Sequence, residues 1–316
     1  MEKSVKYVLA TLIIVVLVVA VYAYIAHQGV DEFEGGDLVD DMGYSLTLTS
    51  PPERIVSLAP SNTEILFAVG AGDKVVGVTN FCNYPYDFAA WIEAGNMTSI
   101  GSFKNPSVEP IIVLDPDLVL ASKQSVAAVE SLRNLGINVL VLDAKNISGV
   151  LRDILLIGRA ADRYSEAVAL ESDLRQKIDA IANQAADATS TPKVYHEVYP
   201  SMSAGPETFI DELITLAGGE NIFHDASTRY PTVSSEAVIE KNPDIMVFPD
   251  KYMGREQFSE TMEDVKNRPG WELISAVQTD AIYEINSDII SRAGPRLADA
   301  LETLAKMIHP EIFGQP

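Results

Sequence analysis

The sequence predicts an α/β protein: two α/β lobes with mostly parallel sheets, joined by one long helix and preceded by an N-terminal transmembrane helix. Three observations predict this architecture. Short apolar runs of strand length alternate with helical patterns, one pattern recurs in both halves, and an uncharged apolar run opens the chain. Strands that alternate with helices are typical of parallel sheets covered on both faces.

The N-terminal segment has the composition of a membrane anchor. Residues 7–26 carry no charge and follow Lys3 and Lys6. About 20 such residues, rising ~1.5 Å each in a helix, span the ~30 Å core of a bilayer. The lysines indicate the cytoplasmic side, so we expect residues 1–27 to anchor the chain with its lobes outside the cytoplasm. A cleaved signal peptide and a secreted protein are the alternative, because Ala23 and Ala26 are small enough to precede a cut.

Charge and cysteine content exclude several classes of partner and tether. Acidic residues exceed basic residues by 22, which argues against nucleic acid or an anionic membrane surface as the partner. The single cysteine, Cys82, lies in the body of the first lobe, so the sequence offers neither a disulfide nor an N-terminal cysteine for a lipid. The N-terminal helix is therefore the only tether that the sequence predicts.

The chain divides into further segments after the anchor. Residues 28–53 carry many Asp and Glu side chains among glycines, which predicts a solvated acidic linker. The N-terminal lobe is expected over 54–147 and the C-terminal lobe over 191–316. Between them, residues 148–190 show helical spacing without a strand, which predicts a connecting helix or two helices in succession.

The secondary structure of both lobes follows from apolar runs and helical spacing. In the N-terminal lobe the expected strands are 55–58, 75–78, 118–121 and 139–142, with a helix at 126–135. In the C-terminal lobe they are 193–198, 245–248 and 281–285, with helices at 209–217 and 296–308. Two short helices, at 64–69 and 212–217, are each closed by a glycine, which tolerates the left-handed position after a helix.

One pattern recurs in both lobes. Residues 107–120 and 234–247 align without a gap. In each copy a Ser precedes a Glu by two residues, an apolar helical turn follows, and Pro-Asp opens a strand. The repeat places Glu109 and Glu236 at equivalent helix starts, so the two lobes are similar domains that face one another.

From Arg54 to the C-terminus the chain resembles the substrate-binding proteins of ABC importers for vitamin B12 and ferric siderophores, and most closely the cobalamin-binding branch. The segments that carry the resemblance are 54–64, 76–78, 83–85, the two repeats, 218–223 and 291–296. The resemblance implies a monomer that delivers a small molecule to a permease dimer with its ATPase subunits. It implies no resident cofactor and no metal site, since the bound molecule is cargo.

The resemblance also implies how the protein docks. In this family a glutamate at the tip of each lobe contacts arginines of the permease dimer, and these residues match Glu109 and Glu236. Two carboxylates on pseudo-symmetric lobes can meet two basic sites on a two-fold partner. The alternative is that each Glu only stabilises the exposed N–H groups at the start of its helix.

The ligand is expected in the cleft between the lobes, at the C-terminal ends of the strands. In the B12-binding branch, aromatic residues from several loops flank the corrin ring. Matched by position, the ligand-binding residues are Phe81, Tyr84, Phe103, Tyr199, Met202, Tyr230, Asp288 and Arg292. Flat apolar side chains suit a large flat ligand. The alternative for any one aromatic residue is ordinary packing, above all for Tyr199 and Met202.

The expected ligand is a corrinoid such as cobalamin, followed by a ferric siderophore and then haem. The chain has Phe and Tyr where tryptophans are typical of the B12 pattern, and Arg229 stands beside Tyr230. A ferric catecholate would need a cluster of basic residues, and only Arg229, Arg292 and Lys104 are candidates. Haem would need an axial Tyr or His, which Tyr84, Tyr199 or Tyr230 could supply.

The sequence predicts a binding protein and not an enzyme. Its four histidines are scattered, at positions 27, 196, 224 and 309, and none forms a zinc-binding pair. His196 and Glu197 are neighbours on one expected strand and so point to opposite faces. The sequence has neither a phosphate-binding glycine loop nor a nucleophile elbow. A membrane-anchored hydrolase, with Ser, His and Asp brought together by the fold, stays open as the less favoured alternative.

Overall fold

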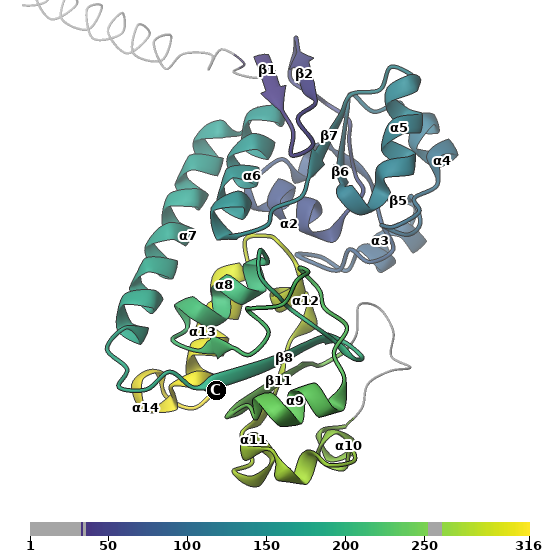
Figure 1. Ribbon diagram of the computed structural model, residues 1–316. Helices are drawn as coiled ribbons and strands as arrows, with labels where there is room; N and C mark the ends of the chain where they lie inside the picture. Colours follow the sequence, from purple (N-terminus) through teal and green to yellow (C-terminus); the bar gives the residue numbers. More distant parts are fainter. Residues whose placement is uncertain (1–32, 34–35, 252–260) are drawn as a thin grey trace, which may run out of the picture.

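The computed structural model of the chain describes residues 33, 36–251 and 261–316. These residues form two α/β lobes, and helix α7 (Tyr164–Ala185) runs along one side from the first lobe to the second (Figure 1). The anchor expected at residues 1–27 lies outside the described residues. Within the described ranges, no helix is both long enough and apolar enough to cross a membrane.

The N-terminal lobe contains a five-stranded sheet in the order β5-β4-β3-β6-β7, with every neighbouring pair parallel. Its strands are β3 (Ile55–Ser57), β4 (Val75–Val78), β5 (Thr98–Ser99), β6 (Leu118–Ser122) and β7 (Val139–Leu142). Its helices are α2 (Pro60–Ala68), α3 (Phe88–Glu93), α4 (Val108–Val113) and α5 (Val126–Asn134). Two 3₁₀ turns, η1 (Gly72–Lys74) and η2 (Lys123–Ser125), complete the lobe. The four predicted strands and the predicted helix are confirmed.

The C-terminal lobe has a parallel sheet in the order β10-β8-β11-β12, with β9 antiparallel to β8. Its strands are β8 (Lys193–Tyr199), β9 (Met202–Ser203), β10 (Glu220–Asn221), β11 (Ile245–Pro249) and β12 (Ile282–Ile285). Its longer helices are α8 (Phe209–Leu216), α9 (Ser235–Lys241) and α13 (Leu297–Ile308). The shorter ones are α10 (Met262–Lys266), η4 (Trp271–Leu273), α11 (Ser275–Gln278), α12 (Ser287–Ser291) and α14 (Pro310–Phe313). The predicted strands and long helices of this lobe are also confirmed.

Equivalent glycines close α2 and α8. Gly70 and Gly218 follow these helices with φ of 77° and 85°, the left-handed conformation that the sequence predicts. At Gly218 a Cβ atom would lie 2.7 Å from Nε2 of His309, so the site requires glycine for space as well as for backbone freedom.

Two helices form the connection between the lobes. Helix α6 (Ile147–Ala160) packs against α7, and the chain turns between them at Asp162, where φ is 60°. The two helices cross closely at Gly158, where a Cβ would lie 2.2 Å from the Cβ of Ala167. Of the two arrangements expected over 148–190, the structure therefore has two successive helices, and α7 alone spans both lobes.

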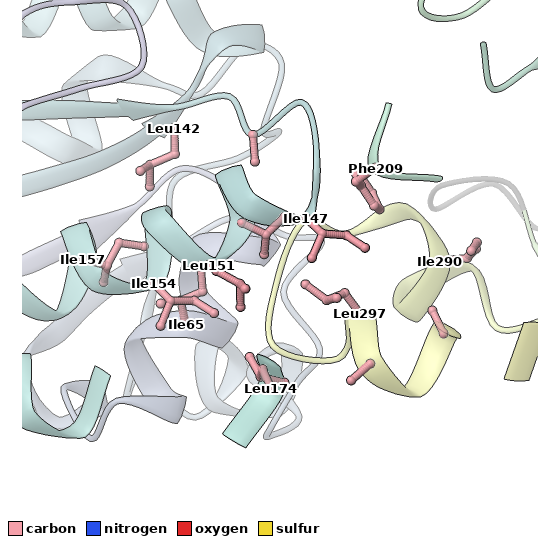
Figure 2. Close-up of a cluster of buried hydrophobic side chains, with 14 of the residues drawn as sticks. Ile65, Leu142, Ile147, Leu151, Ile154, Ile157, Leu174, Phe209, Ile290 and Leu297 are labelled. Carbon is pink, nitrogen blue, oxygen red and sulfur yellow. The ribbon is translucent and has the colours of Figure 1, made fainter. Parts of the chain in front are cut away.

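The lobes share one continuous apolar core around the connector. Ile65 of α2, Ile154 of α6 and Leu174 of α7 belong to the same cluster as Phe209 of α8 and Leu297 of α13 (Figure 2). Separating the lobes would expose this surface at a cost of about 25 cal/mol per Å². The shared core therefore favours small hinge motions over wide opening.

Part of the expected acidic linker is folded. Strands β1 (Gly36–Val39) and β2 (Ser45–Leu48) form an antiparallel hairpin, with Leu38, Leu46 and Leu48 buried. Asp40 is buried too, because Arg133 pairs with it at 2.5 Å and the N–H of Val141 donates to it at 3.1 Å. The expectation of a solvated linker is therefore wrong for 36–48, where alternating leucines bury one face of the hairpin.

A cleft between the lobes as the candidate ligand site

An open cleft with a volume of about 210 Å³ lies between the two lobes. Loops after the parallel strands form much of its wall, as in other open α/β sheets. The N-terminal lobe contributes residues 59–62, 81, 103, 122, 124, 142–144 and 153. The C-terminal lobe contributes residues 209, 229, 230, 287, 288 and 291–293.

Five of the eight predicted ligand-binding residues line this cleft: Phe81, Phe103, Tyr230, Asp288 and Arg292. The structure thus brings together side chains from both lobes that lie more than 200 residues apart. Such a set is what a ligand held between the lobes requires.

The other three predicted residues lie outside the lining. Tyr84 is half exposed and its ring faces the guanidinium of Arg296, 4.2 Å from the ring centroid. Tyr199 ends β8 and pairs in register with Met202 of β9. Their contact with a ligand stays a prediction.

Aromatic side chains stand on both walls of the cleft. On the N-terminal lobe, the rings of Phe81 and Phe103 meet edge to face with centroids 5.2 Å apart. On the C-terminal lobe, Tyr230 is 41% exposed and the guanidinium of Arg229 lies 5.9 Å from its ring centroid. The cleft therefore presents apolar rings from both lobes to whatever enters it.

Arg292 is the centre of a polar network that joins the lobes. Its guanidinium donates to Glu64 at 2.8 Å, to the side-chain oxygen of Asn83 at 2.8 Å and to Asp288 at 2.7 Å. Asn83 in turn donates to Asp288 at 2.7 Å. The two polar residues predicted to contact ligand are therefore already engaged with protein acceptors.

Glu64 is a residue of this network that sequence reasoning missed. It lies in α2, is only 2% exposed, and accepts hydrogen bonds from both Arg292 and Arg296. A buried carboxylate needs such partners to offset its lost hydration. Its occurrence as the one charged residue of α2 is the signal that could have found it.

A second ion pair crosses the cleft near Tyr230. Arg229 of the C-terminal lobe lies 3.8 Å from Asp143 of the N-terminal lobe and donates to the carbonyl of Glu207 at 2.8 Å. Lys123 also approaches Asp143, at 3.4 Å. Both lining arginines, Arg229 and Arg292, are thus matched by protein carboxylates.

The cleft wall also contains a buried carboxyl that sequence reasoning missed. Asp153 of α6 is 3% exposed, and Arg152 donates a hydrogen bond to it at 3.4 Å. Burial, reinforced by the nearby charge of Asp41, raises the pKa of Asp153 to about 8. An acidic residue on the apolar face of an amphipathic helix is the signal for it.

Glu109 and Glu236 occupy equivalent and exposed places. Each is the second residue of its helix, Glu109 in α4 and Glu236 in α9. Hydrogen bonds from its own backbone N–H and from Ser234 lower the pKa of Glu236. This local role at a helix start leaves the carboxylate accessible, so it is compatible with docking.

One of the scattered histidines, His196, lies in the interior of the C-terminal lobe. His196 is fully buried, its Nδ1 lies 3.1 Å from the carbonyl of Val247, and burial lowers its pKa to about 4. Across the described ranges, no group of three or more His, Cys, Asp or Glu side chains is placed to hold a metal ion.

Comparisons with known proteins agree with this architecture. Residues 55–289 match the profile of a family described as periplasmic binding protein. The chain is 34% identical over 284 residues to an uncharacterized ABC transporter substrate-binding lipoprotein of Bacillus subtilis, covering 87% of this chain and 85% of the relative. It is 31% identical over 279 residues to a cobalamin-binding protein of Halobacterium salinarum, covering 85% of this chain and 73% of that protein.

A solved structure with the same fold has a different ligand in its name. The apo form of a periplasmic haem-binding protein from Roseiflexus sp. RS-1 matches with a TM-score of 0.71 and 26% identity, covering 81% of this chain and 98% of the other. The fold is therefore shared by proteins that bind different ligands.

Proposed function

The chain belongs to the periplasmic binding protein family, and from this membership we propose that it is a membrane-tethered, extracytoplasmic protein that delivers a corrinoid to an ABC importer. The assignment to ABC importers follows from the substrate-binding relatives. The ligand, the tether and the docking residues are the parts that we add.

The composition of the cleft supports a corrinoid. Phe103 on one wall and Tyr230 on the other offer apolar rings to a large flat ligand, and this pair is the observation that carries the proposal. The lining arginines, Arg229 and Arg292, are paired with Asp143, Glu64 and Asp288. A polyanionic ferric siderophore would have to displace these carboxylates, so the charge pattern disfavours it.

Haem is the second candidate because one observation favours it. Tyr230 lines the cleft with a half-exposed ring, and a tyrosine can serve as an axial ligand of haem iron. The shared fold of the haem-binding protein is compatible with this alternative.

The docking proposal concerns Glu109 and Glu236. Both are exposed and both occupy the second position of a helix that follows a loop of the cleft. We assign them to contacts with basic residues of a permease dimer, where opposite charge fixes orientation and speeds encounter.

The proposed tether is the apolar segment 1–27. The Bacillus subtilis relative is named a lipoprotein, but the only cysteine of this chain, Cys82, is buried in the N-terminal lobe. The tether that we propose is the uncharged run 7–26, which in a helix would reach across a bilayer (about 30 Å).

A single binding measurement ranks the ligands. Full-length protein in detergent is incubated with cyanocobalamin, a set of ferric siderophores or haem, desalted, and examined for retained absorbance. We expect retention of cyanocobalamin. Retention of haem or a ferric siderophore alone would replace the corrinoid assignment, and turnover of a ligand would favour the hydrolase alternative.

A further inference from the structure

Asp153 is the one acidic residue on the buried face of α6. The buried residues of this helix are otherwise apolar or glycine: Ile147, Gly149, Val150, Leu151, Ile154, Ile157, Gly158 and Ala160. Asp153 also belongs to the lining of the cleft. Burying a carboxyl group without a strong partner is costly, so its place beside the ligand site calls for a functional reason.

The charges nearest Asp153 are mostly of its own sign. Asp41, from the turn after β1, and Asp143, from the loop after β7, both act on it. Asp41 is held in place by the N–H of Asp143, which donates to it at 2.6 Å. The nearest cation, Arg152, is 61% exposed in its side chain and also pairs with Asp41. Among the charges that act on Asp153 directly, carboxylates therefore outnumber cations.

Several other charged groups on neighbouring elements pair with partners other than Asp153. Lys123 and Arg229 approach Asp143 at 3.4 and 3.8 Å. On the helices that pack against α6, Glu64 of α2 binds two arginines, Glu171 of α7 pairs with Arg175, and Glu212 of α8 accepts from the N–H of Ile147. None of these pairs supplies a counter-charge to Asp153 itself.

Resting on the proposed function, we propose that Asp153 selects the ligand's side groups: the cleft wall beside it accepts N–H donors such as primary amides and rejects carboxylates. In the low dielectric of a partly closed cleft, a carboxyl group acts on a ligand's charge even without direct contact. A corrinoid fits this pattern because amides fringe its ring. A ligand with ionised carboxylates at the same place meets like charge.

The raised pKa of Asp153 gives the proposal a distinctive readout. Since burial raises this pKa to about 8, the group is mostly protonated at pH 6.5 and mostly ionised at pH 9. Ionisation strengthens its attraction for an amide N–H and its repulsion of a carboxylate. Discrimination between the two groups should therefore grow as pH rises through 8.

The test compares cyanocobalamin with its monocarboxylic acids, in each of which one side-chain amide has been hydrolysed to a carboxylate. Dissociation constants are measured at pH 6.5 and 9 for the full-length protein in detergent. For at least one of the acids, we expect its dissociation constant divided by that of cyanocobalamin to be about tenfold higher at pH 9 than at pH 6.5. A tenfold change corresponds to a shift of about one unit in the pKa of Asp153 between the two complexes. In Asp153→Asn the ratio should be independent of pH.

Two further variants keep the result interpretable. Asp173→Asn removes a carboxylate from the exposed side of α7 and should behave like the parent protein. Asp153→Ser also removes the carboxyl group, with a smaller side chain, and should give the same pH-independent ratio as Asp153→Asn. It provides the measurement if the asparagine variant folds poorly.

The outcomes separate this inference from the proposed function. If the ratio of the acid and amide dissociation constants does not change with pH in the parent protein, Asp153 has no such role. The same holds if the ratio rises equally in both Asp153 variants, and in either case the corrinoid assignment stands. Failure of the parent protein to bind any corrinoid overturns both.

Discussion

Glu64 in α2 of the N-terminal lobe accepts two hydrogen bonds from Arg296, which lies just before α13 of the C-terminal lobe, at 2.7 and 2.9 Å. Arg292 adds a third at 2.8 Å. The lobes are thus joined by a buried ionic cluster at the cleft as well as by the apolar core around α6 and α7. This arrangement explains how two separate sheets can hold a cleft of fixed shape.

Glu64→Ala should therefore destabilise the protein by about 3 kcal/mol, because it removes the buried carboxylate that the guanidinium groups of Arg292 and Arg296 share. Urea unfolding of the full-length protein in detergent measures the loss. The matched control is Glu130→Ala, which removes an exposed glutamate from α5 and should change the free energy of unfolding by less than about 0.5 kcal/mol. Equal effects of the two substitutions would mean that the cluster contributes nothing beyond its surface charges.

Tyr230→Ala should weaken ligand binding by about 1–3 kcal/mol and leave stability nearly unchanged, since its ring is 41% exposed in the cleft. Tyr164→Ala is the matched control, because Tyr164 is 40% exposed at the start of α7, outside the cleft lining. Titration with cyanocobalamin compares the two. Unchanged affinity in Tyr230→Ala would remove this residue from the ligand site.

Phe103→Ala should weaken binding to a similar degree, but it should also cost stability. Phe103 is only 9% exposed and packs against Phe81. We expect a loss of about 2–4 kcal/mol in the free energy of unfolding, as for other truncations of buried aromatic residues. Thermal or urea unfolding without ligand measures it, and normal stability with normal affinity would contradict both expectations.

Asp153→Asn should stabilise the protein increasingly as pH rises. Because the pKa of Asp153 is raised in the folded state to about 8, its contribution to stability is greatest below pH 4 and falls as pH rises towards 8. The asparagine variant escapes this loss, so its advantage should grow between pH 4 and 8 to on the order of 5 kcal/mol by pH 9. Urea unfolding at pH 5, 7 and 9 tests the trend, with Asp173→Asn as the control. A difference that does not vary with pH would show that Asp153 titrates normally.

The parts of the fold that the sequence predicts are those whose pattern is local. Strands such as Val139–Leu142 are buried on both faces, so an apolar run is sufficient to identify them. The two-residue strands β5, β9 and β10 carry no such run. In the hairpin at 36–48 the acidic composition conceals the alternation of buried leucines, because Asp40 and Asp41 are satisfied by partners from β7, α5 and α6.

The residues of the cleft also divide into those that the sequence indicates and those that depend on contacts between distant segments. The places of Phe103 and Tyr230 on the cleft wall could be predicted from the resemblance to the family, which matches both by position, each six residues before the repeated glutamate of its lobe. Glu64 and Asp153 could not, because their roles depend on groups distant in sequence: Arg292 and Arg296 for the first, Asp41 for the second. Pairing between lobes is decided by tertiary structure, and no local pattern reports it.

The N-terminal segment should keep the protein in the membrane. Residues 7–26 carry no charge and follow two lysines, which favours a retained helix with the lobes outside the cytoplasm. Membranes washed with alkaline carbonate should retain the full-length chain. Recovery of a soluble form that starts near Tyr24 or His27 would contradict the anchor and favour a cleaved signal.

Charge reversal at Glu109 and Glu236 distinguishes a role in docking from a role in ligand binding. Glu109→Lys with Glu236→Lys should abolish transport by the reconstituted importer, because lysines would face the basic residues that we assign to the permease. Each single change should do part of the damage, since each lobe meets its own half of a two-fold partner.

A control that makes the same change of net charge is available elsewhere on the surface. Glu130→Lys with Glu272→Lys reverses one exposed glutamate in each lobe and should leave uptake intact. Cyanocobalamin titration of both double variants should give the affinity of the parent protein, because none of the four residues lines the cleft. If uptake and ATPase stimulation survive the reversal of Glu109 and Glu236, these residues only stabilise the starts of α4 and α9. Loss of ligand affinity in that variant would instead place the two helix starts within the binding site and not on a separate docking surface.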